Sequence, residues 1–163
     1  IADRGSGIAD RGSGCGVCGG KSSVAGMDLA PSHAMARIVD HRDLDVWKHA
    51  MLLAEGVFKA TARFPVEETY GIRSQLRRAS VSVPRNIAEG HSRGTTGEFV
   101  RFLRIARGSL AETMTLLELA RRLGYTQSFD EEMLAAEINR VGPMLTRLLQ
   151  VLQARRKNCG RQP

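Results

Sequence analysis

The chain has 163 residues, 42% of them apolar and 5% aromatic, with a formal net charge of +7 at pH 7 and an isoelectric point near 10. A single hydrophobic core usually organises about 100 to 200 residues, so we expect one folded domain. No run of about 18 uncharged apolar residues is present, which argues against a transmembrane helix or signal peptide and favours a soluble cytoplasmic protein.

The N-terminal stretch has an unusual composition. Its first fourteen residues repeat IADRGSG twice, and the glycine-rich character continues to about Gly26. Such a segment cannot bury enough apolar surface to offset the entropy lost on ordering. We predict a low-complexity, disordered tail over residues 1–40.

The cysteine content gives little sign of a disulfide or metal framework. Three cysteines fit a reducing compartment, and Cys15 with Cys18 forms a single C-x-x-C. The nearby histidines, His33 and His41, have seven residues between them. In zinc sites the two histidines of a ligand pair usually have three to five residues between them, and a second closely spaced pair completes the site. The metal signal is therefore weak, and we predict no metal and no cofactor.

The first two helices are indicated by apolar residues at steps of three and four. The first follows Asp43, a candidate N-cap, and ends near Phe64; its expected inward stripe is Leu44, Trp47, Met51, Ala54, Phe58 and Ala62. The second begins near Glu67 and Glu68, whose charges suit a helix N-terminus, and ends between Gly90 and Gly94. Its expected stripe is Ile72, Leu76, Ala79, Val83 and Ile87.

Two further helices begin with capping signals. Thr95 with Glu98 has the form of a capping box, and Gly124 is the expected stop of this third helix. Ser128 with Glu131 repeats the box, and Pro143 predicts a bend in the fourth helix. The expected inward residues are Phe99, Leu103, Ala106, Leu110, Met114 and Leu117 in the third helix and Met133, Ile138, Val141, Leu145, Leu148 and Leu152 in the fourth.

Four helices with short connections predict an all-α fold, an antiparallel up-down-up-down four-helix bundle. We expect the bundle to span residues 41–156, with a C-terminal tail over 157–163. No strand alternation is present.

The stretch RASVSVPRNIAEGHSRG, residues 78–94, is unusual for a helix interior. Pro84 removes one amide donor and should bend the helix, and Asn86 is placed to bond a carbonyl that the bend frees. Ala79, Ser80, Ser82, Ala88 and Gly90 are small enough for another helix or subunit to approach the backbone. We interpret these residues chiefly as packing and kink residues.

Positive charge is concentrated in residues 73–122, which hold ten Arg, no Lys and four Glu, or +6. This run is either an ordinary solvated helix face or a surface for RNA or DNA, which it would bind with strong salt dependence. Aromatics that stack bases are few, and Trp47 and Phe58 are assigned to the core stripe. The candidate nucleic-acid-binding residues are Arg73, Arg77, Arg78, Arg85, Arg93, Arg101, Arg104 and Arg107.

Enzymatic activity is not indicated. The carboxylates pair with Arg at helical spacing, as Glu118 does with Arg122, and Glu89 with His91 has the wrong spacing for a di-iron bundle. The segment GHSRGTTG lacks the preceding strand and the Gly-Lys of a phosphate-binding loop. We predict a protein that is not an enzyme.

Three segments carry a family resemblance: DLDVWKHA (43–50), FPVEETYGIRSQLRRASVSVPRNIAEGHSR (64–93) and EFVRFLRIARGSLAETMTLLELARRLGY (98–125). In order and spacing they resemble the small bacterial four-helix-bundle proteins encoded by intervening sequences within 23S ribosomal RNA genes. The resemblance spans residues 43 to about 155 and implies a ring-like homo-oligomer, with a pentamer as the expectation.

A related branch is the accessory variability determinant protein of diversity-generating retroelements, which binds a reverse transcriptase and nucleic acid through a positive surface. By similarity, Arg73, Arg77, Arg78, Arg85 and Arg93 are candidates for that role. Our prediction is thus a non-enzymatic, oligomeric basic bundle that binds RNA or DNA or scaffolds a nucleic-acid enzyme. The alternative is a structural module whose Arg residues make subunit contacts.

Overall fold

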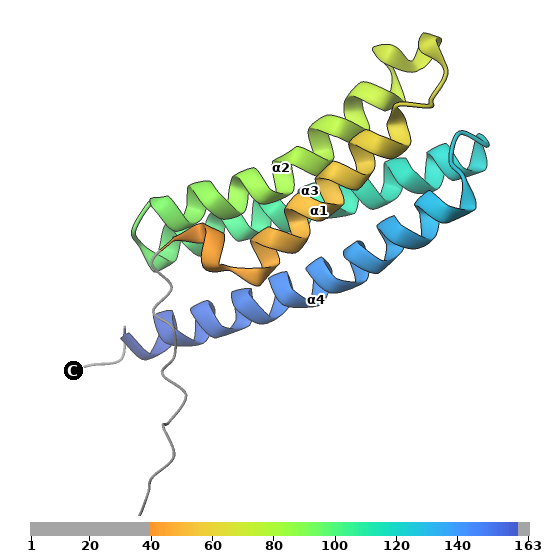
Figure 1. Cartoon of the computed structure of the whole chain (residues 1–163). Coiled ribbons are helices and arrows are strands. Elements are labelled where there is room, and N and C mark those ends of the chain that lie inside the picture. Colours follow the sequence, from red (N-terminus) through yellow and green to blue (C-terminus); the bar gives the residue numbers. More distant parts are fainter. Residues whose placement is uncertain (1–39, 160–163) are drawn as a thin grey trace, which may run out of the picture. The chain divides into compact units, whose positions relative to one another are not determined.

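The computed structural model describes residues 40–159, and the side chains of residues 40–156. Within that range the chain is all-α, as predicted, and has no strand. Four long helices run antiparallel, and short 3-10 helices precede α1 and α2 (Figure 1). The elements are η1 (His41–Asp43), α1 (Asp45–Thr61), η2 (Val66–Thr69), α2 (Ile72–Ser92), α3 (Thr96–Arg122) and α4 (Ser128–Cys159).

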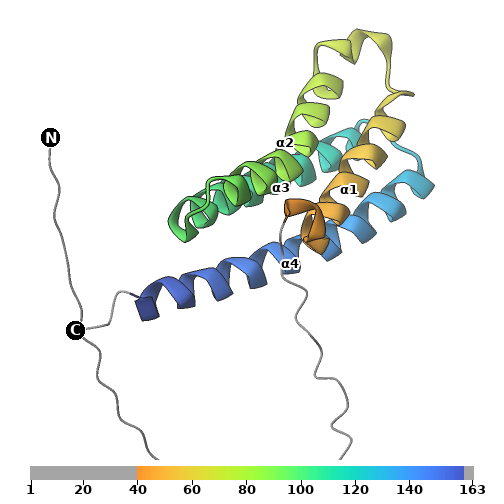
Figure 2. The same ribbon diagram turned by 60° about the vertical axis from the view of Figure 1, so that its left-hand side comes forward.

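The helices form a closed ring of neighbours: α1 packs on α2, α2 on α3, α3 on α4 and α4 on α1 (Figure 2). The predicted tails, residues 1–40 and 157–163, fall largely outside the described residues and stay predictions. Among the described residues, no helix combines the length and the apolar character needed to span a membrane.

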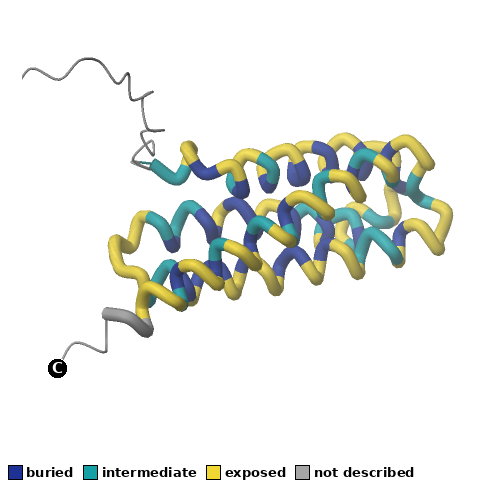
Figure 3. The backbone as a smooth tube through the Cα atoms, turned by 90° about the horizontal axis from the view of Figure 1, so that it is seen from below, coloured by how far each residue is buried: buried dark blue, intermediate teal, exposed yellow. Residues whose placement is uncertain are grey.

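The core lies between the inward faces of the four helices, and the outward faces are exposed (Figure 3). The predicted stripe of α2 is confirmed, because all five of its residues are buried. Burying such a stripe is the main driving force for a bundle, at roughly 25 cal/mol per Å² of apolar surface. The largest fully buried apolar side chains are Leu53, Leu76, Ile87, Leu103 and Leu145.

The inward face of α1 differs from the prediction. Met51 and Phe58 are each 44% exposed, and the buried positions include Leu53 and Val57. Apolar residues occur on both sides of this helix, so their period alone does not identify the side that meets the other helices. Met114 of α3, also predicted inward, is 48% exposed.

The helix ends agree with the sequence in α3 and differ in α1, α2 and α4. Glu67 and Glu68, predicted to begin the second helix, belong to η2, and α2 begins at Ile72. Thr95 accepts a hydrogen bond from Glu98 N at 3.3 Å, and Gly124 follows α3 with φ of +72°. Asp43, predicted to cap α1, belongs instead to η1, which is capped by Asp40. Ser128 is itself the first residue of α4 rather than its cap.

Helices α2 and α3 approach each other closely at Gly90. A Cβ atom on Gly90 would lie 2.6 Å from Phe102 Cβ, nearer than two such atoms come in proteins. The predicted close approach at this small residue is confirmed, and α3 is the element that makes it. Pro84 lies buried inside α2 without ending it.

Asn86 bonds a different carbonyl from the one expected. Pro84 leaves the Ser80 carbonyl without its usual amide partner. The Asn86 side chain instead donates to the Ser82 carbonyl at 2.7 Å and to the Ser82 hydroxyl at 2.9 Å. Ser109 of α3 donates to that same hydroxyl at 3.0 Å, so the network ties α2 to α3.

We expect Gly90→Ala to destabilise the bundle by about 1 to 3 kcal/mol, because the new methyl group overpacks the α2–α3 contact. The control is Gly108→Ala in α3, where a Cβ meets nothing within 4 Å. That change should stabilise the protein by up to about 1 kcal/mol through helix propensity. Urea unfolding of both variants checks this; equal shifts of the two midpoints would contradict the close contact.

Candidate functional site

A groove of about 520 Å³ lies over the outer face of α2. The helices that pack on α2 each contribute to it, Phe58 from α1 and Glu112 from α3. It brings together three of the eight predicted arginines. The lining residues are Phe58, Gln75, Arg77, Arg78, Ala79, Val81, Ser82, Arg85 and Glu112.

Arg77 is held in place by α1. Its Nε donates to Thr61 Oγ1 at 2.8 Å, and Nη2 donates to the Phe58 carbonyl at 3.4 Å. The guanidinium carbon lies 4.8 Å from the centre of the Phe58 ring, a cation–π contact. These contacts fix the guanidinium plane while leaving its charge uncompensated by any carboxylate among the described residues.

Arg78 and Arg85 are the unpaired cations of the groove. Both are exposed, and within the described part of the chain neither side chain makes an ion pair or a hydrogen bond. They are seven residues apart, which places them on the same side of α2. Ser82, four residues after Arg78, lies on that same side between them.

The groove also contains one unpaired carboxylate, that of Glu112, and one hydroxyl with a proton to donate, that of Ser82. Glu112 has no cationic partner among the described residues, so the three arginines and this glutamate give +3 − 1 = +2. Ser82 Oγ accepts hydrogen bonds from both Asn86 and Ser109. Because a hydroxyl has two acceptor positions and one donor, the Ser82 proton stays available to the groove.

Arg73 does not join the groove. Its Nη2 donates to the Phe64 and Pro65 carbonyls, and its Nε is buried without a partner. It therefore fastens the start of α2 to the connection that follows α1. The structure places this predicted candidate, partly buried, against the α1–α2 connection rather than in the groove.

Arg93 and Arg101 lie at the opposite end of α2 and α3 from Arg78. Arg93 pairs with Glu89 at 2.7 Å, and Arg101 with Glu98 at 3.5 Å. Glu89 raises the pKa of Arg93 by a side-chain hydrogen bond. Both guanidiniums lie within 6 Å of the Phe102 ring, at 5.4 and 5.8 Å, but that ring is buried.

Arg104 and Arg107 complete the predicted set, and both are exposed without an ion pair among the described residues. Each three-residue step in an α-helix turns the side chain back by about 60°, so Arg107 lies about 120° around α3 from Arg101. Arg101 and Arg107 therefore do not lie on the same face of α3. None of the three lines the groove.

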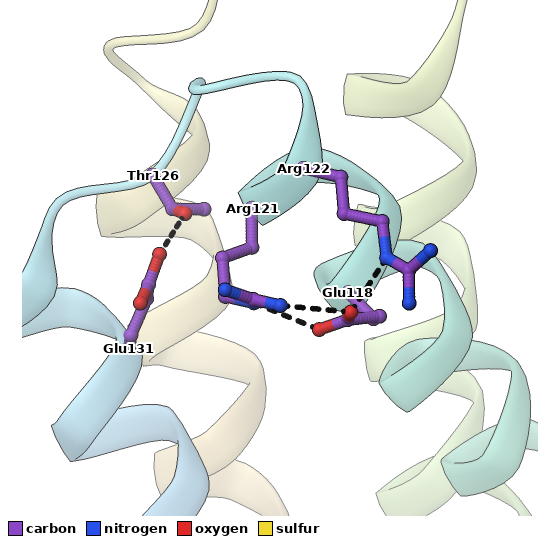
Figure 4. Close-up of polar contacts among 5 residues, drawn as sticks. All are labelled: Glu118, Arg121, Arg122, Thr126 and Glu131. Atoms are coloured by element: carbon purple, nitrogen blue, oxygen red, sulfur yellow. Dashed lines mark hydrogen bonds and ion pairs between the residues drawn. The ribbon is translucent and has the colours of Figure 1, made fainter.

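The two arginines at the end of α3 share one glutamate (Figure 4). Glu118 accepts hydrogen bonds from Arg121 at 2.8 and 2.9 Å and from Arg122 at 2.7 Å. Hydrogen bonds from Arg121 and then Arg122 lower the pKa of Glu118 to about 2. Both guanidiniums are therefore engaged by a carboxylate, and the three groups together keep one net positive charge.

Sequence reasoning missed Phe58, Ser82 and Glu112 as groove residues. Phe58 was assigned to the core, and Ser82 was assigned to packing. The available signal was the seven-residue spacing of Arg78 and Arg85, which places Ser82 between them on the same side of the helix. The positions of Phe58 and Glu112 depend on how α1 and α3 pack on α2, which their own sequence does not specify.

The possible metal ligands are only partly covered by the structure. Cys15, Cys18 and His33 lie outside the described residues. Within residues 40–156, no three His, Cys, Asp or Glu side chains come together in a way that could hold a metal ion.

Comparison with known families gives one match. The model of the family described as 23S rRNA-intervening sequence protein matches residues 42–147, which is more than half of the chain. The match includes all three groove arginines. No curated protein matches the chain. The relation to diversity-generating retroelement proteins stays a prediction.

The Glu118 cluster leads to a pH prediction. A carboxyl whose pKa is lowered on folding contributes stability that is complete above its unfolded pKa, near 4.5, and is lost as the pH falls towards 2. We expect NMR titration to give a Glu118 midpoint near 2, rising towards 4.5 in Arg121→Gln/Arg122→Gln. Arg140→Gln, on α4, should leave the midpoint unchanged; a wild-type midpoint near 4.5 would contradict the pairing.

Proposed function

Because the chain belongs to the 23S rRNA-intervening sequence protein family and carries a groove with unpaired cations, we propose that it is a non-enzymatic basic bundle that binds RNA or DNA. The observation that supports this best is the pair Arg78 and Arg85, exposed and unpaired on the same side of α2. Arg77 adds a third positive charge beside them. The proposal includes a cytoplasmic location.

The physical basis is electrostatic. An arginine already paired with a carboxylate gains little from meeting a phosphate, because it must give up its first partner. Arg78 and Arg85 have no such partner among the described residues. When they contact phosphates, the free energy gained from releasing the counterions of the nucleic acid is therefore not offset by the loss of an ion pair. The planar guanidinium also offers two parallel donors to a phosphate, which Lys does not.

The family resemblance adds an oligomer to the proposal. A ring-like homo-oligomer, a pentamer by the expectation stated above, would repeat the groove in every subunit. Several weak sites on one particle bind a long polyanion much more tightly than one site does. Such a particle could also present its nucleic acid to an enzyme, for example a reverse transcriptase.

A second candidate function is a structural module in which this surface contacts another subunit. Val81 on α2 and Ile105 on α3 favour it, because they are 42% and 44% exposed although both are aliphatic. In that case the groove arginines would face carboxylates of a neighbouring copy. The two candidates differ in what removing Arg78 and Arg85 should do.

The first test measures nucleic-acid affinity over a salt series. We expect wild-type protein to bind structured RNA and duplex DNA at low salt and to lose affinity steeply as salt rises. Arg78→Gln/Arg85→Gln should reduce the slope of log affinity against log salt by about 1.4 to 1.8, or 0.7 to 0.9 for each lost phosphate contact.

The matched control is Arg147→Gln/Arg155→Gln. It removes the same charge from two positions on α4 that are exposed and, among the described residues, unpaired like Arg78 and Arg85. Its slope should change clearly less than that of the groove variant. Equal slopes for the two variants, or no binding even at low salt, would refute binding at this groove.

The second test measures the oligomeric state of the same two variants by sedimentation. Under the nucleic-acid proposal, both variants keep the wild-type assembly, because Arg78 and Arg85 face a polyanion rather than a subunit. Dissociation of the Arg78→Gln/Arg85→Gln variant alone would instead support the subunit-contact function.

A further inference from the structure

We propose that the groove takes single-stranded nucleic acid, with a nucleobase stacked on Arg77 and the phosphates of the same strand on Arg78, Ser82 and Arg85. This inference rests on the proposed function, because it names the form of nucleic acid that the same groove binds. It depends on one property of the groove: apolar side chains and unpaired cations lie side by side in it.

The apolar part of the groove is what distinguishes a single strand from a duplex. Phe58 is 44% exposed and Val81 is 42% exposed, and both line the groove with Ala79. A duplex keeps its bases stacked inside and presents mainly phosphates and sugars, so it would leave this apolar surface uncovered. A single strand can place a base there while its phosphates reach the cations.

Arg77 provides the stacking surface. One face of its guanidinium lies on the Phe58 ring, and hydrogen bonds to Thr61 and the Phe58 carbonyl restrict its rotation. Arg77 also lines the groove and is only partly buried, so the base is assigned to the guanidinium face turned away from Phe58. Bases stack on guanidinium planes in RNA-binding proteins, and a plane that is already fixed loses little entropy when one does.

The phosphate contacts lie along α2. Arg78, Ser82 and Arg85 follow one another at four and three residues, so the Cα atoms of the two arginines are about 10.5 Å apart along the helix axis. That separation suits two phosphates of one strand better than a single phosphate held by both. The Ser82 hydroxyl supplies a neutral donor between them, because both of its acceptor positions are already used.

Size and charge restrict the ligand further. About 520 Å³ is within the range of sites that hold small organic molecules, roughly 300 to 1,000 Å³, so the groove is large enough for a nucleotide. Glu112 repels phosphate from the α3 side, which places the strand over α2. We expect Glu112→Gln to raise single-strand affinity about two- to fivefold, by removing this repulsion.

The experiment compares an RNA strand of about a dozen nucleotides with the duplex of the same sequence, at equal salt. The strand carries 2-aminopurine at one internal position, whose fluorescence reports base stacking. We expect the single strand to bind about fivefold or more tightly than the duplex, and its fluorescence to change on binding.

Two variants test the stacking directly. Arg77→Lys keeps the charge and removes the plane, so single-strand affinity should fall about fivefold or more while the salt slope stays the same. Phe58→Leu removes the support of that plane and should act in the same direction. The matched controls are Arg140→Lys and Phe129→Leu on α4, where Phe129 is 75% exposed; both should leave affinity and fluorescence unchanged.

The outcomes separate this inference from the proposed function. Equal affinity for strand and duplex, with no effect of Arg77→Lys or Phe58→Leu, would overturn the single-strand inference but leave salt-dependent binding at Arg78 and Arg85 in place. If the Arg78→Gln/Arg85→Gln variant bound nucleic acid with the same affinity and salt slope as the wild type, the proposed function at this groove would be overturned as well. Circular dichroism of each variant ensures that a lost affinity is not a lost fold.

Discussion

The close contact between α2 and α3 at Gly90 is the constraint on which the rest of the molecule depends. Because Gly90 has no Cβ, the Cβ atom of Phe102 can lie within 2.6 Å of the position that a Cβ on residue 90 would occupy. Once the two helices are this close, Ser109 reaches Ser82, and the hydroxyl network fixes the rotation of α2 about its axis. That rotation turns Arg78 and Arg85 outward into one groove, so a packing constraint at one end of the helix pair determines a surface further along it.

Sequence periodicity predicted α2 correctly and α1 incorrectly for the same physical reason. In α2 the apolar stripe lies on one side, and the other side carries Arg and Ser with Val81 as the exposed exception, so only one orientation buries the stripe. In α1, apolar residues surround most of the helix, with Leu52 and Phe58 exposed while Leu53 and Val57 are buried. Which side faces inward then depends on the shapes of α2 and α4, which no pattern within α1 contains.

The arginines show where sequence reasoning about a site succeeds and where it stops. Pairing of Glu118 with Arg121 and Arg122 follows from spacings of three and four residues along one helix, and so can be predicted locally. Arg73 and Arg77 lie in the same stretch of sequence as Arg78. Yet Arg73 donates to the Phe64 carbonyl after α1, and Arg77 donates to the Thr61 hydroxyl at the end of α1. Those partners are close only in the folded chain, so counting charges overestimates the number of arginines that can meet a ligand.

Some arginines of residues 73–122 are paired and others are not. The charge of +6 on this segment therefore does not by itself mean that the segment binds every polyanion equally well. Arg93, Arg101, Arg121 and Arg122 are paired with glutamates on their own helices. Arg77 contacts the Phe58 ring, and four arginines of this segment, all among the described residues, remain exposed and unpaired: Arg78, Arg85, Arg104 and Arg107. A restrained guanidinium beside two unpaired cations is chemically different from a uniform positive face, because it favours a ligand that carries both an aromatic ring and phosphates.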